Sequence, residues 1–101
     1  MPEIDRIIHQ PVRLRIMASL VTLPPKAQAD FRYLRDLLKV TDGNLGAHLQ
    51  TLERAGYIEV EKTFVARKPR TFLSVTAKGR RAFRSHVQAL NRITSGTEKP
   101  E

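Results

Sequence analysis

The stretch TDGNLGAHLQTLERAG (residues 41–56) has the pattern of a helix and decides how the rest of the chain is interpreted. Its leucines recur at the spacing of one buried helical face: Leu45, Leu49 and Leu52. Thr41 is a suitable N-cap, and Gly56 suits the position just past the C-terminus. Two further glycines in the opening turns are unexpected, because each costs roughly 1 kcal/mol relative to Ala in a helix interior.

The outward face of this helix accounts for the glycines if it must approach another molecule closely. The side opposite the leucines carries Gly43, Ala47, Gln50 and Arg54, flanked by Gly46, Thr51 and Asn44. Such a face is small at its N-terminal end and rich in hydrogen-bonding groups beyond it. It fits a DNA major groove, where amide side chains read adenine and methyl groups contact thymine. The alternative is that TDGN is a flexible turn and that the helix begins near Leu45.

Three helices are predicted before this one. Ile4, Ile7 and Ile8 have the spacing of a short amphipathic helix that ends before Pro11. Pro11 suits the first turn of a second helix, which stops at the prolines of LPPK and has this apolar stripe: Leu14, Met17, Leu20 and Val21. Asp30 is placed to cap FRYLRDLLK (residues 31–39), whose expected buried face is Phe31, Leu34, Leu37 and Leu38. A short turn through Val40 then joins two consecutive helices.

After Gly56 the period of the pattern changes to two. In YIEVEKTF (residues 57–64), Ile58 and Val60 alternate with glutamates, which predicts a half-buried strand. VARKPR (residues 65–70) is expected to be a loop, and TFLSV (residues 71–75) a second strand. Thr76 is placed to cap a last helix, from Ala77 to about Thr94. This order predicts a mainly α fold with a small β-hairpin (α+β), which is a winged helix-turn-helix.

These segments together resemble a known family. HQPVRLRIMASL (residues 9–20) and the stretch from DFRYLRDLL to GRRAF (residues 30–83) are similar to the small winged-helix regulators related to the MarR and ArsR transcription factors. The most similar group of these carries the patterns LTDGNLSxHLxxLExAGY and GRxPRTxxxLTxxGRxAF. The resemblance covers roughly residues 4–92, and its motifs are specific in combination.

The resemblance implies a homodimer that binds operator DNA through the helix at 42–55 in the major groove and through a wing at 62–71 on the minor groove or the backbone. We expect a near-palindromic double-stranded site, as two-fold symmetry requires. Together with the outward face described above, the DNA-contact residues are then Thr41, Gly43, Asn44, Gly46, Ala47, His48, Gln50, Thr51 and Arg54 in the helix, and Lys62, Arg67, Lys68 and Arg70 in the wing. Two departures stand out. Gly46 replaces a common Ser, and Ala66 replaces a common Gly, which predicts a wider turn in the wing.

The charge also favours nucleic acid as the partner. The 101 residues include 18 Lys and Arg against 10 Asp and Glu, for a formal net charge of +8. From Lys62 to Thr97 there are nine basic residues and no acidic one. A merely solvated basic surface is the alternative, but so long an acid-free stretch is typical of a chain that meets a polyanion.

Other functions find little support in the sequence. Without cysteine there is no disulfide, thiolate metal site or cysteine nucleophile. His9, His48 and His86 stand far apart without ligand spacing, so we expect no metal and no cofactor. No glycine loop for phosphate, carboxylate pair or serine with a recognisable base is present, so we expect no enzyme. No apolar run is long enough for a membrane span, and the acidic N-terminus lacks a signal-peptide layout. A soluble, cytoplasmic protein at the nucleoid is expected.

We expect one domain at residues 1–94 and a disordered tail at 95–101, since the tail is polar. The apolar stripe of the last helix is interpreted either as core or, with the first helix, as a dimer interface: Ile4, Ile7, Ile8, Phe83, Val87, Leu90 and Ile93. The alternative function is a winged-helix module that binds a protein partner or binds nucleic acid without sequence preference. The sequence names no operator, regulated gene or small-molecule effector.

Overall fold

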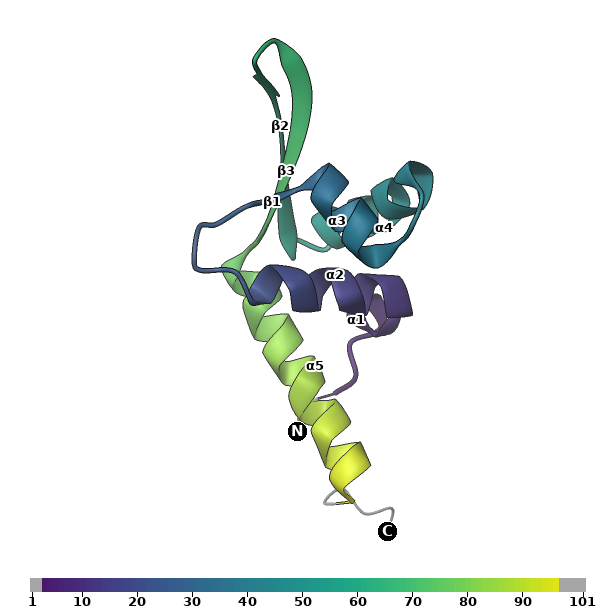
Figure 1. Cartoon of the computed structure of the whole chain (residues 1–101). Coiled ribbons are helices and arrows are strands. Elements are labelled where there is room, and N and C mark those ends of the chain that lie inside the picture. Colours follow the sequence, from purple (N-terminus) through teal and green to yellow (C-terminus); the bar gives the residue numbers. More distant parts are fainter. Residues whose placement is uncertain (1–2, 97–101) are drawn as a thin grey trace.

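Residues 3–96 are described here from a computed structural model (Figure 1). Its elements are α1 (Arg6–His9), α2 (Pro11–Val21), β1 (Ala29–Asp30), α3 (Phe31–Leu38), α4 (Asp42–Arg54), β2 (Ile58–Val65), β3 (Lys68–Val75) and α5 (Ala77–Ser95). The strands form one antiparallel sheet in the order β1-β3-β2. The predicted fold class, mainly helical with a small hairpin and a long last helix, is confirmed.

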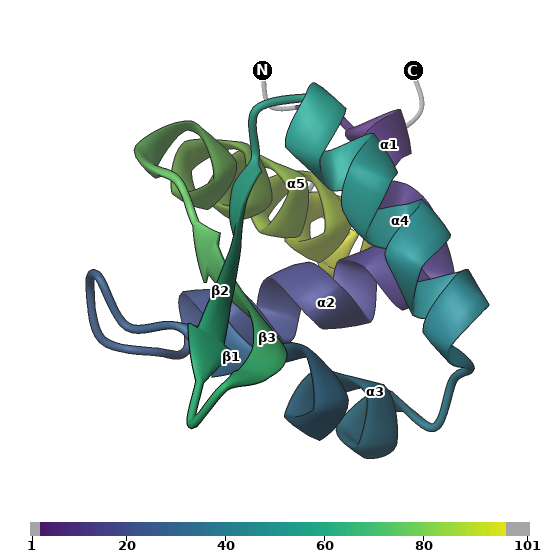
Figure 2. The ribbon, with the colours of Figure 1, turned by 90° about the horizontal axis from the view of Figure 1, so that it is seen from above.

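Helix α2 lies at the centre of the helical layer, with α3, α4 and α5 around it (Figure 2). It also contacts β3, so the sheet and the helices share one core. Removing this apolar surface from water is the main force that stabilises the fold. The largest fully buried apolar side chains are Ile8, Ile16, Met17, Leu20, Leu34, Leu45, Leu52 and Leu73.

Every helix begins at a side chain that accepts hydrogen bonds from the first turn, which satisfies N–H groups that have no partner inside the helix. These N-caps are Asp5, Gln10, Asp30, Thr41 and Thr76. The three caps predicted from the sequence are confirmed. Helix α4 therefore begins at Asp42, and the interpretation of TDGN as a flexible turn is wrong.

The hairpin differs from its prediction in two ways. Val65 pairs with Lys68, so the turn consists of Ala66 and Arg67 alone, and β3 begins three residues earlier than expected. Both turn residues have positive φ, of 51° and 66°. This is the left-handed backbone of a tight two-residue hairpin turn, which usually selects Asn-Gly. The expectation of a wider turn is therefore wrong.

Two buried or exposed side chains, one short strand and the packing of α5 also differ from the sequence pattern. Leu37 is 48% exposed rather than buried, whereas Ile16, outside the predicted stripe, is fully buried. Strand β1 was not predicted, because two residues are too short to show a period. In α5 the buried positions are Gly79, His86 and Ala89, so the helix packs on its small residues and on a histidine.

The molecule is elongated, with extents of 59 × 25 × 21 Å. The hairpin of β2 and β3, here called the wing, projects at one end, and the C-terminal turns of α5 project at the other (Figure 1). Helix α5 continues to Ser95, one residue past the expected domain boundary; residues 97–101 of the expected tail lie outside the described part. Among residues 3–96, no helix is long and apolar enough to cross a membrane.

Candidate nucleic-acid interface

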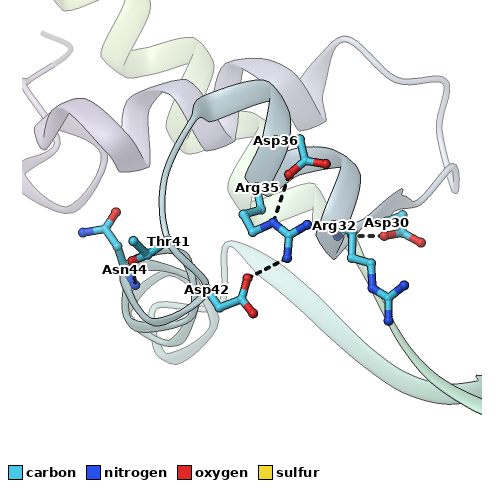
Figure 3. Close-up of polar contacts among 7 residues, drawn as sticks. All are labelled: Asp30, Arg32, Arg35, Asp36, Thr41, Asp42 and Asn44. Carbon is cyan, nitrogen blue, oxygen red and sulfur yellow. Dashed lines mark hydrogen bonds and ion pairs between the residues drawn. The ribbon is translucent and has the colours of Figure 1, made fainter.

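The start of α4 is held against α3 by one arginine. The guanidinium of Arg35 donates to Asp36 at 3.0 Å and to Asp42, the first residue of α4, at 2.9 Å (Figure 3). Both carboxylates are exposed, so the pairs add little stability. Their effect is to orient the helix and to compensate the negative charge of Asp42 next to the N-terminus of α4. Asn44 points away from this cluster (Figure 3).

The two faces of α4 are as predicted. Leu45, Leu49 and Leu52 are buried. The candidate contact residues on the other side are exposed or half-buried: Gly43, Asn44, Ala47, Gln50 and Arg54 are exposed, and Gly46, His48 and Thr51 are half-buried. A Cβ placed on Gly43 or Gly46 meets no atom within 4 Å. Neither glycine is therefore required by packing inside the domain.

His48 lies at the edge of this face and is engaged within the domain. Its Nδ1 is 3.1 Å from a guanidinium nitrogen of Arg13 on α2. Because arginine can only donate, Nδ1 must accept, and the imidazole is neutral. Partial burial, with the charge of Arg13 as a second cause, lowers the pKa of His48. His48 is thus a polar flank of the helix and does not supply a positive charge.

The wing has two different faces. Because side chains alternate along a strand, Val60, Lys62 and Phe64 lie on one face, and Glu59 and Glu61 lie on the other. The register places Thr71 opposite Lys62 and Pro69 opposite Phe64, on the same face. The acids of β2 are thus kept away from the face that carries Lys62, and Glu61 accepts a hydrogen bond from Gln28 at 2.8 Å.

A cleft of about 540 Å³ lies between α4 and the Lys62 face of the wing. Gly43, Gly46, Ala47 and Gln50 line it from α4. Val60, Lys62 and Thr71 line it from the wing, and Glu53 is the acidic residue in its lining. The glycines therefore widen a space that lies between the exposed helix and the basic hairpin.

The four basic residues assigned to the wing are not equivalent. Arg70 donates to Asp30, with 2.9 Å between Nε and Oδ2, and its guanidinium lies 5.7 Å from the ring centre of Phe72. This hydrogen bond lowers the pKa of Asp30. Asp30 also caps α3, so Arg70 ties the wing to the helices. Among the described residues, Lys62, Arg67 and Lys68 form no ion pair.

The residues expected at a dimer interface are divided between core and surface. Ile8 is fully buried in its own domain and has no surface for a second chain. Ile7 and Phe83 pack partly on the core. Ile4, Val87 and Leu90 are half-buried, and Ile93 is 57% exposed.

One contact and one exposed side chain were missed from the sequence. Arg80 donates to the carbonyl oxygens of Val21 and Leu23 at 3.1 and 3.2 Å and so closes the end of α2. Phe64, near the tip of the wing, is 72% exposed. Phe64 shares a strand face with the charged Lys62, which could have indicated that this face is exposed at the tip. No sequence signal marks the partner of Arg80, which depends on tertiary packing. Within residues 3–96 there is no group of three metal-ligating side chains.

Comparisons with known proteins agree with this geometry. A family model described as a winged helix DNA-binding domain matches residues 12–94. The chain is 33% identical over 93 residues to the uncharacterized protein MJ0432 of Methanocaldococcus jannaschii, covering 92% of this chain and 98% of that one.

Solved structures are similar as well. A transcriptional regulator homologue from Pyrococcus horikoshii OT3 has a TM-score of 0.81 and 32% identity, with 93% of this chain and 90% of that chain covered. A protein described as a regulator of the MarR family from Enterococcus faecalis V583 has a TM-score of 0.74 at 19% identity, covering 92% and 81%, and supports the fold. The match over most of the chain shows that it belongs to the family of winged helix DNA-binding domains.

Proposed function

We propose that this protein is a transcriptional regulator that binds a specific double-stranded DNA sequence as a homodimer and acts as a repressor by occupying its site. The observation that carries the proposal is the outward face of α4. It has two glycines whose Cβ positions are open, followed by amide and hydroxyl side chains, and it borders a basic wing. A face without bulk approaches base edges in the major groove closely.

The charged side chains and the amide side chains have different proposed roles, the first in affinity and the second in sequence preference. Lys62, Arg67 and Lys68 are exposed cations that are suited to phosphate contacts, which are independent of sequence. Asn44 and Gln50 are exposed amides suited to base edges. Thr41 uses its hydroxyl to accept from the Asn44 N–H at 3.0 Å, so it orients Asn44 and leaves its own O–H free to donate to a phosphate.

Two copies are proposed because one helix contacts only one half-site. In a two-fold dimer the two α4 helices enter successive major grooves about 34–36 Å apart on a near-palindromic site. The apolar stripe of α5, with Ile93 exposed, supplies the contact between chains.

Selection from a random pool of DNA duplexes at two salt concentrations tests the proposal, together with the mass of the protein in solution. We expect an enriched near-palindrome bound by a dimer. Salt-sensitive binding without an enriched sequence would instead favour a non-specific nucleic-acid module, and absence of binding would favour a protein partner.

Substitutions at Gly46 test the role of the open face. Gly46→Leu should fold normally, since its Cβ position is empty, yet it should weaken binding to the enriched duplex at least about tenfold by blocking close approach. Gly46→Ala is the matched control, with a smaller loss. Equal affinity of both variants and the wild type would contradict groove contact by this face.

A further inference from the structure

The tip of the wing carries exposed apolar side chains that the fold does not use. Phe64 is 72% exposed and Val65 46% exposed, although both are large hydrophobic residues. Pro69, the cross-strand partner of Phe64, is exposed too. Phe64 is the most exposed large hydrophobic side chain among residues 3–96. Its position at the end of a projecting hairpin (Figure 1) leaves it available to another molecule.

The two apolar side chains lie on different faces of the hairpin. Strand alternation places Phe64 in one row with Val60 and Lys62, which both line the cleft beside α4. Val65 lies on the opposite face, with Glu59 and Glu61. Phe64 therefore continues the surface of the cleft outward to the tip, and Val65 does not.

The backbone holds Phe64 in a narrow, defined tip. The turn has only two residues, Ala66 and Arg67, both in the left-handed conformation. Arg70, which pairs with Thr63 in the third pair from the turn, is bound to Asp30 of β1. The ladder between β2 and β3 is continuous from Ile58 to Val65. The tip is thus slim and carries no long loop.

The charges around Phe64 favour an anionic partner. Lys62 lies two residues away on the same face and Arg67 lies in the adjacent turn, whereas Lys68 pairs with Val65 on the opposite face. The sequence contains no acid from Lys62 to Thr97. A partner must then offer negative charge and an apolar surface together. The DNA minor groove does so, because phosphates border it and its walls are formed by deoxyribose rings. Apolar side chains, Phe and Pro among them, recur in proteins that contact this groove.

We propose that Phe64, supported by Pro69, is an apolar finger that packs in the minor groove beside the major groove occupied by α4. The inference rests on the proposed function and deepens it by naming the wing residue that contributes through apolar contact. Lys62, on the same face, and Arg67, in the turn, hold the bordering phosphates. Because the minor groove differs between A·T and G·C pairs mainly by the guanine amino group, the finger gives a preference at base pairs that α4 does not reach.

Salt dependence separates the finger from the cations. Binding of the wild type, Phe64→Ala, Arg67→Ala and Val65→Ala to the enriched duplex is measured across a series of salt concentrations, with thermal unfolding of each variant as the folding control. Phe64→Ala should lose about tenfold in affinity with an unchanged salt slope, since an apolar contact releases no counterions. Arg67→Ala should reduce the slope by about 0.9. Val65→Ala, on the other face, should bind like the wild type.

A second measurement locates the contact in the minor groove. Base pairs flanking the enriched core are changed to G·C and to inosine·C, which present the same minor groove except for the guanine amino group. The wild type should prefer inosine·C, and Phe64→Ala should lose this preference.

The outcomes distinguish the two proposals. Failure of the wild type to bind any duplex would contradict both the proposed function and the proposed role of Phe64. Normal binding and an unchanged inosine preference in Phe64→Ala would remove the finger and leave DNA binding intact. A change in the mass of Phe64→Ala in solution would instead assign Phe64 to a contact between chains and also overturn the finger.

Discussion

The helical glycines of this chain differ in what a methyl group would meet. At Gly46 a Cβ has open space, whereas at Gly79 it would lie 2.1 Å from the carbonyl oxygen of Tyr57. Gly79 is buried where α5 crosses the segment that leads into β2. It is needed so that the two backbones can approach closely. Gly46 has no such role inside the domain, which is why its helix penalty points to an external partner.

Alanine substitutions at these two positions should have opposite effects on stability. Gly79→Ala should lower the free energy of unfolding by about 1–3 kcal/mol, the usual range for an overpacked site. Gly46→Ala should raise it by roughly 0.5–1 kcal/mol, because Ala favours the helix. Urea unfolding followed by circular dichroism measures both. Destabilisation by Gly46→Ala would show that this glycine has a structural role after all.

At the scale of elements, a buried histidine fastens the N-terminal segment to α5. His86 is fully buried, and its Nδ1 accepts from the backbone N–H of Asp5 at 3.0 Å. Asp5 caps α1 and accepts from the Tyr57 hydroxyl at 2.6 Å. Burial, assisted by Asp5, raises the pKa of Tyr57 to about 12, so the hydroxyl remains a donor. One cluster thus joins α1, α5 and the segment before β2.

The stability of this junction should depend on pH. Burial, followed by the nearby His9, lowers the pKa of His86, while Asp5 acts in the opposite direction. Protonation would also place a proton on Nδ1, facing the Asp5 N–H. A histidine with a lowered folded pKa contributes stability above its unfolded pKa of about 6.5 and loses it as the pH falls. The free energy of unfolding should therefore decrease from pH 7 to pH 5.

Substitutions identify the group responsible. His86→Gln keeps an acceptor for Asp5 without titrating, and should remove much of the slope between pH 7 and pH 5. His48→Gln is the control, because the pKa of His48 is also lowered and accounts for a separate part of the slope. The lowered pKa of Asp30 acts near pH 4 and below, outside this window. A full slope in His86→Gln would exclude His86 as its source.

The elements that could be predicted are those whose periodic pattern extends over many residues and whose caps are local in sequence. Helix α4 was predicted with both its ends, since Thr41 and Gly56 act on neighbouring backbone. Other features depend on partners distant in sequence. Strand β1 exists because Ala29 and Asp30 pair with β3, and the turn at Ala66 follows from the strand register rather than from turn residues. In the candidate site, the outward face of α4 was predictable, but the pairing of Arg70 with Asp30 was not.

In the whole molecule, the surface proposed for DNA binding and the surface proposed for dimerisation lie at different ends. The radius of gyration is 14.9 Å, against about 13 Å for a compact chain of 100 residues. The excess comes from the wing and from α5, which project at opposite ends (Figure 1). Helix α5 buries small residues and His86 toward its own core. Its larger apolar side chains at 87, 90 and 93 are left at least partly uncovered, so a second chain can pack on α5 without covering the wing.

This arrangement predicts that dimer formation and DNA affinity fall together. Ile93 is 57% exposed in the single chain, so replacing it in Ile93→Glu should leave folding nearly unchanged. The mass of this variant in solution should fall to that of a monomer, because a charge would lie in the contact between chains. A dimer that binds two linked half-sites has roughly 10²–10⁴-fold higher affinity than a single domain on one half-site. The affinity of Ile93→Glu for the palindrome should therefore fall by a factor of this order. On a single half-site it should bind like the wild type, because α4 and the wing are intact.

Ile93→Leu, which preserves the apolar surface, is the control and should remain dimeric. A variant that stays dimeric with glutamate at this position would move the contact between chains away from the end of α5, to a surface that leaves the stripe at 87–93 open for a different partner.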